Sequence, residues 1–119
     1  MNTHTILPSP IQTYLDTINQ NNPAGFLACF APDAVVRDVG HEYRGTQAIK
    51  EWSEREIFGV QVRLEFIRLV QNADAWCVTV KVEGNFDRTG LPDPLLMRND
   101  FTLTGERIAT LMCSLAQGE

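Results

Sequence analysis

Asp38 is the residue of this sequence whose type and position best suit it to chemistry. It ends the β-branched run AVVRD and is followed shortly by a glycine, His41 and a glutamate. Side chains alternate along a strand, so Asp38 should share a face with Val36. It is therefore either a solvated acid at a strand end or a carboxylate that points into a cavity. A dry cavity would raise its proton affinity, as a general base requires.

A second polar pair lies near the end of the chain, where Arg98 and Asp100 are two residues apart in LLMRNDFTL. A period of two places both on one strand face. The simplest interpretation is an ion pair on the sheet, in which the guanidinium keeps the carboxyl ionised. Anchoring of a ligand and catalysis are the alternatives.

Three further side chains are candidates with a structural alternative. Tyr14 lies in an apolar helical stripe, either as a core aromatic or with its hydroxyl at a site. Glu56 falls near the centre of the stripe of a later helix, either solvated at the helix end or in a pocket. His41 is expected to be exposed in a loop, with a contact at the rim of a pocket as the alternative.

The cysteines and histidines do not indicate a metal site. Cys29, Cys77 and Cys113 are far apart, and two histidines add no zinc-type spacing. Isolated cysteines with apolar neighbours are typical of reduced thiols in a reducing compartment. We expect no metal and no cofactor.

Length and composition predict one globular domain over residues 1–119, with an ordered core at about 9–116. The chain is 44% hydrophobic and 21% charged, and its net charge is −5. This balance disfavours nucleic acid as a partner. The sequence also lacks a signal peptide pattern and an apolar run of about 20 residues, so we expect a cytoplasmic protein and no membrane partner.

The elements that must position these residues can be placed from turn signals and periodicity. SPIQTYLDTIN predicts a helix with Ser9 as its N-cap and Gln12 completing a capping box. PAGFLACF predicts a short second helix, and AVVRD the first strand. A third helix is expected to begin at a capping Thr46 and to end at Gly59.

After Gly59 the sequence predicts four long antiparallel strands. Apolar residues alternate up to Phe66, and the phase then slips at Ile67, as at a β-bulge. The loop DRTGLPDP separates the second strand from the third, and Gly105 lies in a tight final turn. This order predicts an α+β fold: three helices packed on a strongly curved, mostly antiparallel sheet that forms a conical barrel with an internal pocket.

The order of elements and several segments resemble the nuclear transport factor 2-like (cystatin-like) superfamily, in particular its SnoaL-like and ketosteroid-isomerase-like branch. The segments that carry the resemblance are YL in the first helix, FAPDAVVRD, YRGTQAIKEW and GERIATLMCSL, within residues 11–115. The superfamily contains both enzymes and binding proteins, so the resemblance is specific for the fold and weak for the function.

The resemblance implies roles for three residues. Ketosteroid isomerases use an Asp base at the end of the first strand, where Asp38 falls. Their oxyanion hole pairs a Tyr of the first helix with a protonated Asp of the penultimate strand, which Tyr14 and Asp100 resemble. The acid that cyclases and epoxide hydrolases of the superfamily place on the last strand has no counterpart in RIATLMCSL.

Two functional hypotheses follow. The first is a small-molecule pocket protein with cofactor-independent acid–base chemistry, of isomerase or lyase type, on an apolar carbonyl compound. The second is a non-catalytic ligand-binding or dimerisation module of the same fold. The residues predicted to contact the ligand are Arg98, Trp52, Glu56, Phe26, Phe30, Trp76, Val78, Val80, His41, Leu111 and Cys113.

A homodimer is predicted through the outer face of the sheet. A period of two places Met97, Phe101 and Leu103 together on the penultimate strand, with Ile108 and Met112 as candidates on the last. If the helices occupy the opposite face, this stripe would otherwise be exposed apolar surface.

Overall fold

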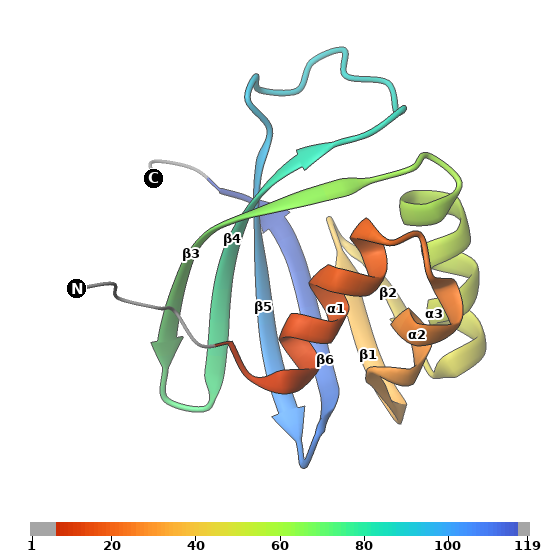
Figure 1. The fold of residues 1–119 in the computed structure, drawn as a ribbon, viewed down its shortest axis with the longest axis vertical. Coiled ribbons are helices and arrows are strands. Elements are labelled where there is room, and N and C mark those ends of the chain that lie inside the picture. The colour runs from red at the N-terminus through yellow and green to blue at the C-terminus, as the bar shows by residue number, and fades with distance from the viewer. Residues whose placement is uncertain (1–6, 117–119) are drawn as a thin grey trace.

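The computed structural model describes residues 7–116 of the chain (Figure 1). The N-terminal residues 1–6, which enter the prediction that no signal peptide is present, lie outside the described range. Among residues 7–116, no helix combines the length and apolar character that crossing a membrane requires. The elements are α1 (Ser9–Asn19), α2 (Pro23–Ala28), β1 (Phe30–Asp38), β2 (His41–Arg44), α3 (Thr46–Ser53), the π-helical η1 (Glu54–Phe58), β3 (Arg63–Asn72), β4 (Ala75–Glu83), β5 (Leu96–Thr104) and β6 (Arg107–Leu115).

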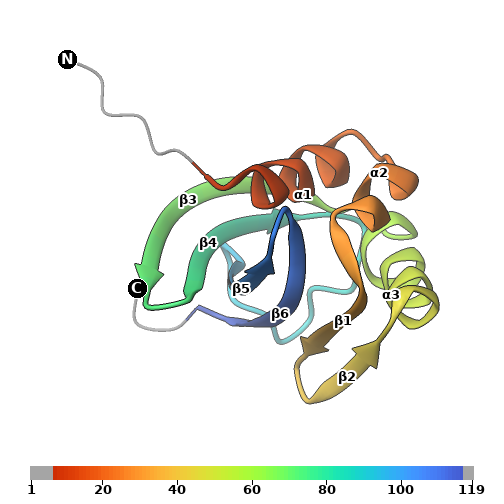
Figure 2. The same ribbon diagram turned by 90° about the horizontal axis from the view of Figure 1, so that it is seen from below.

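The strands form one six-stranded sheet in the order β2-β1-β6-β5-β4-β3. The β1–β6 pair is parallel and the other pairs are antiparallel. Figure 2 shows the strong curvature of the sheet and the helices against one of its faces, which we call the inner face. These features confirm the predicted α+β fold. The sheet is curved but unclosed, however, so the predicted barrel is an open one with β2 and β3 at its edges.

The predicted N-caps of two helices are wrong by one residue. Ser9 and Thr46 are the first helical residues, and the cap positions are held by Pro8 and Gly45, neither with a side-chain cap. Pro8 is extended, with ψ of 144°, and Gly45 has φ of 88°, so the chain enters each helix from a non-helical backbone that needs no capping hydroxyl.

The first strand is longer than predicted, and it is followed by a strand that the sequence did not reveal. The Ile108 amide donates to the Cys29 carbonyl oxygen at 2.7 Å, and Phe30 pairs with Ile108, so β1 starts directly after α2. Beyond Asp38, a two-residue turn lets the chain fold back as β2, with Asp38 opposite His41. His41 is exposed, as expected, but lies on a strand instead of in a loop.

The later elements agree more closely with their predictions. The register of β3 against β4 shifts between Phe66 and Arg68, which confirms the predicted bulge. The predicted third helix continues from α3 into η1 and stops before Gly59. A π-helical turn widens the helix at its end, next to the site described below.

The stripe on which the homodimer prediction was based lies on the other face of the sheet. Phe101 is fully buried and its ring lies 5.0 Å from that of Tyr14 in α1, between centroids. Ile108 is also fully buried, and Met97 faces a cavity under the helices. The predicted phase of β5 was therefore inverted: its odd-numbered residues from 97 to 101 point inward, and Leu103 follows a register shift after Thr102. A homodimer remains a prediction without this support.

The edge strand β3 is held to α1 by one side chain. Asn19 donates from Nδ2 to the Leu64 carbonyl oxygen at 2.8 Å and accepts from the Leu64 amide at 2.7 Å. These are the two backbone groups that an edge strand otherwise leaves unpaired in the protein. The amide of Asn19 therefore takes the place of a further strand at this position.

We predict that Asn19→Ala lowers the free energy of unfolding by ~1–3 kcal/mol, because two backbone groups lose their partner. Urea denaturation followed by circular dichroism measures the change. Gln20→Ala, at the exposed neighbouring position, is the matched control and should change it by less than about 0.5 kcal/mol. Equal midpoints for the two variants would show that the clamp contributes nothing.

Candidate active site

A cavity of about 120 Å³ lies between the helices and the inner face of the sheet. Apart from Glu56 of η1, its polar residues come from four elements: Tyr14 from α1, Asp38 from the end of β1, Trp52 from α3 and Asn99 from β5. The rest of its wall is mostly apolar and includes Ile18, Ile57, Val62, Leu64, Val80, Val82 and Met97, together with Glu56 and Cys113.

Asp38 points into this cavity. The indole Nε1 of Trp52 donates to its Oδ2 at 3.0 Å. Trp52 is itself fixed by burial and by stacking on Tyr43, with ring centroids 6.0 Å apart. The end of β1 thus supplies the carboxylate, and α3 sets its orientation. Of the two alternatives for Asp38, the structure has the carboxylate that points into a cavity and not the solvated acid.

Tyr14 lines the same cavity. Its hydroxyl donates to Oδ1 of Asn99 at 3.3 Å, and the hydrogen bond is buried. Burial raises the pKa of Tyr14 well above 10.0, and nearby Cys113 and Asp38 raise it further. The phenol therefore stays protonated and can act as a hydrogen-bond donor over the physiological range.

Asn99, and not Asp100, is the β5 residue that faces Tyr14. Asn99 is 4% exposed and lies between Met97 and Phe101 on the inner face. The sequence contained a signal for it, because an amide flanked at i±2 by two apolar residues belongs to their face. The prediction missed this signal because Asp100 was matched to the acid of the ketosteroid isomerases.

Arg98 and Asp100 lie on the outer face of the sheet, which corrects their predicted places in the pocket. Their side chains form an ion pair, with Arg98 Nη2 3.2 Å from Asp100 Oδ1. Neither lines the cavity. The ion-pair alternative is therefore correct, and the guanidinium does not compete with a ligand for Asp38.

The other predicted ligand contacts divide into three groups. Val80, Trp52, Glu56 and Cys113 line the cavity. The buried core, away from the cavity wall, contains Phe26, Phe30, Val78 and Leu111, and Trp76 packs against this core while half-buried. His41 lies at a separate hollow near the β1–β2 turn.

Glu56 connects the cavity to a larger groove. It lies on η1, and its Oε2 is 3.2 Å from Nε of the exposed Arg55. The groove has a volume of about 410 Å³ and shares Glu56, Val62, Val82 and Met97 with the cavity. Its outer walls come from the β1–β2 turn and the β4–β5 loop. A ligand could therefore extend from one into the other.

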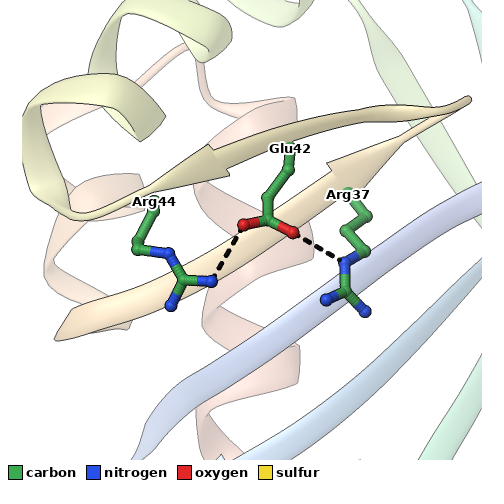
Figure 3. A network of polar contacts seen from close by, with 3 residues as sticks. All are labelled: Arg37, Glu42 and Arg44. Carbon is green, nitrogen blue, oxygen red and sulfur yellow. Dashed lines mark hydrogen bonds and ion pairs between the residues drawn. The ribbon is translucent and has the colours of Figure 1, made fainter.

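Beside the site, a charged network braces β2 against β1 (Figure 3). Glu42 accepts from Arg37 at 3.1 Å and from Arg44 at 2.9 Å. These hydrogen bonds lower the pKa of Glu42. The network is exposed and none of its residues lines the cavity, so we assign it to the hairpin that carries Asp38.

The cavity contains proton-transfer and hydrogen-bonding groups but no metal-binding cluster. Across residues 7–116, no group of three His, Cys, Asp or Glu side chains is arranged to hold a metal ion. What the arrangement offers is two carboxylates, Asp38 and Glu56, with one protonated phenol and one amide around a mostly apolar space.

Comparison with known proteins identifies the fold and the family of the chain. The fold is the nuclear transport factor 2-like fold of several solved structures. A model of the SnoaL-like domain matches residues 11–111, so the chain belongs to the SnoaL-like family.

Three solved structures illustrate the range of similar proteins. A candidate polyketide cyclase from Sinorhizobium meliloti is 30% identical, with a TM-score of 0.80 over 91% of this chain and 95% of that one. A Catenulispora acidiphila protein with a ketosteroid isomerase-like fold, in complex with trimethylamine, is 19% identical, with a TM-score of 0.76 over 94% and 88%. The Δ5-3-ketosteroid isomerase of a Mycobacterium species is 16% identical, with a TM-score of 0.72 over 92% and 93%.

The raised pKa of Tyr14 predicts a loss of stability at high pH. An unfolded tyrosine releases its proton above pH 10.0, whereas folded Tyr14 retains it. The unfolded state then binds fewer protons, so the free energy of unfolding falls as pH rises, by up to ~1.4 kcal/mol per pH unit for this one group. Tyr14→Phe should lack this contribution.

Urea unfolding of wild type and Tyr14→Phe between pH 8 and 11 measures it. The comparison also cancels the contribution of Cys29, whose pKa burial raises to about 11 in both proteins. We expect the steeper decline above pH 10 in wild type. Parallel curves would mean that Tyr14 ionises in the folded protein.

Proposed function

We propose that this protein is a small-molecule enzyme that transfers a proton at a carbon next to the carbonyl group of an apolar compound, as ketosteroid isomerases do. The observation that carries the proposal is that Asp38 and Tyr14 line one cavity, with Asp38 oriented by the Trp52 indole. A carboxylate base and a neutral hydrogen-bond donor that line one mostly apolar space are the groups that this reaction needs.

The reaction would proceed in two proton transfers. Asp38 removes a proton from the carbon next to the carbonyl, and the electron pair moves onto the carbonyl oxygen. Tyr14 donates a hydrogen bond to that oxyanion, in place of its bond to Asn99. Asp38 then returns the proton to a different carbon of the same molecule, so that a double bond shifts and no cofactor is consumed.

Asn99 gives the oxyanion site a different chemistry from a protonated acid. Its Oδ1 accepts from Tyr14, which leaves the amide nitrogen as a second donor. An amide donates at every pH, whereas a carboxyl must be kept protonated to do so. We therefore assign Tyr14 and Asn99 as the oxyanion pair and remove Asp100 from that role.

The similarity to a candidate polyketide cyclase supports the substrate class. Polyketide cyclisation also starts by removing a proton next to a carbonyl. The strand β6 (Arg107–Leu115) carries no acidic residue. The resemblance to the superfamily's cyclases would imply an acid on this last strand. We therefore favour isomerisation over ring closure.

A Δ5-to-Δ4 ketosteroid isomerisation assay tests the proposal. We predict measurable turnover by wild type, a loss of about 10²–10⁴-fold in kcat for Asp38→Asn, and a loss of about 10²-fold for Tyr14→Phe. Asp100→Asn is the matched control, because it makes the same chemical change on the outer face, and it should leave kcat within about twofold.

Native mass spectrometry of the freshly purified protein distinguishes the alternative. Turnover that is unaffected by Asp38→Asn would contradict the proposed base. No turnover, together with a small apolar molecule retained by the protein, would support the non-catalytic binding module instead. A retained molecule small enough to fit the cavity of about 120 Å³ would favour the binding module further.

The homodimer and the cytoplasmic location stay predictions. Met112, which is 45% exposed on β6, is the apolar residue of the predicted set that the outer face retains. Sedimentation velocity at micromolar concentration should show a dimer in wild type and a shift toward monomer in Met112→Asp. A wild-type monomer would contradict the prediction.

A further inference from the structure

The groove outside the cavity is lined mostly by apolar residues, with Glu56 and Asp87 as its charged ones, and it has no role in the proposed chemistry. The β4–β5 loop (residues 84–95, at the top of Figure 1) contributes Phe86, Leu91 and Leu95 to it, and the β1–β2 turn contributes Val39. Leu91 and Val39 are 37% and 72% exposed. The cavity holds only about 120 Å³, so most of a drug-sized ligand would lie in the groove, whose volume is about 410 Å³.

Val39 is held in a backbone conformation that its side chain disfavours. Its φ is 47° and that of Gly40 is 86°, in the two-residue turn between Asp38 and His41. Positive φ at both central positions is typical of a type I′ turn, which favours Asn-Gly. A β-branched residue is a poor choice there, because its branched side chain crowds the backbone.

This choice of residue has no structural explanation in the turn itself. Val39 buries little of its own surface and stabilises no core contact, since it is mostly exposed. What it does provide is an apolar side chain one residue after Asp38, at the mouth of the site. Strain of this kind at a site is typical of residues retained for function at a cost in stability.

From this we infer that Val39 is a specificity-determining residue, which contacts the apolar body of an elongated ligand in the groove while the ligand's carbonyl end reaches Tyr14 in the cavity. The inference rests on the proposed function for the carbonyl end. The place of the ligand's apolar body is inferred from the continuity of the groove with the cavity. The two share Val62, Val82 and Met97, and also Glu56.

Two methyl ketones, 2-butanone and 2-decanone, test the inference by NMR titration. In wild type each methylene that enters the groove should tighten binding by about fourfold. Val39→Asn should weaken 2-decanone binding about tenfold and leave 2-butanone unchanged, while it raises Tm by ~3–6 °C as the turn relaxes. Leu91→Asn, in the β4–β5 loop that forms another wall of the groove, should weaken the binding of 2-decanone to a similar extent without raising Tm.

Ala73→Asn is the matched control. Ala73 has φ of 48° in the two-residue β3–β4 turn, and it does not line the groove. This turn lies at the opposite end of the strands from the β4–β5 loop (Figure 1). Ala73→Asn should raise Tm, as Val39→Asn does, and leave the affinity for both ketones unchanged. This separates relief of backbone strain from loss of a ligand contact.

Two results would overturn the inference. One is wild-type affinity that does not increase from 2-butanone to 2-decanone. The other is a Val39→Asn protein, or a Leu91→Asn protein, that binds 2-decanone as tightly as wild type. Failure of wild type to bind 2-butanone at all, with no shift of Tyr14 resonances, would instead contradict the proposed carbonyl site itself.

Discussion

The structure depends on the pairing of polar side chains inside an apolar space. Asp38, Tyr14 and Asn99 enter this space from three different elements, and each would cost free energy if it were buried alone. The Trp52–Asp38 and Tyr14–Asn99 hydrogen bonds offset this cost. They also join helix to strand in both cases, so the pairs that satisfy burial are the same pairs that fix the relative positions of the site residues.

Loops border the way into this arrangement. The cavity under the helices continues into the groove, with which it shares part of its wall. The β1–β2 turn and the β4–β5 loop border the groove there. A set of polar groups fixed by hydrogen bonds between helices and strands therefore lies beside walls that loops provide, which is a common arrangement of scaffold and loops.

Much of this could be predicted from the sequence, because hydrophobic periodicity determined the elements and their order. The helix stripe that contains Tyr14, the bulge after Phe66 and the inward direction of Asp38 all follow from local patterns. The strand β2 could not be predicted in this way, since His41–Arg44 has no apolar alternation and is fixed by its turn and by the Arg37–Glu42–Arg44 network. Its formation is a consequence of tertiary pairing.

The phase of β5 shows why the rest of the site was misassigned. LMRNDFTLT contains both a polar pair, Arg98 and Asp100, and an apolar set that includes Phe101, and a period of two puts the two groups on opposite faces. The pattern does not say which of the two faces the helices cover. Matching Asp100 to the acid of the ketosteroid isomerases placed the polar pair under the helices, which is wrong. Burial energetics choose the other face, because Phe101 must be covered and an ion pair prefers water.

This inversion changes the electrostatics of the site as well as its membership. A carboxyl in the place of Asn99 would be a titratable group coupled to the charge of Asp38, whereas the amide of Asn99 carries no charge and does not titrate. The cation that could have neutralised such a pair, Arg98, is on the far side of the sheet. The charge next to Tyr14 is therefore that of Asp38, and the phenol, whose pKa is raised by burial, by Cys113 and by that charge, is kept neutral without a titrating partner. In the reaction that we propose, such a site would bind the oxyanion through neutral donors alone.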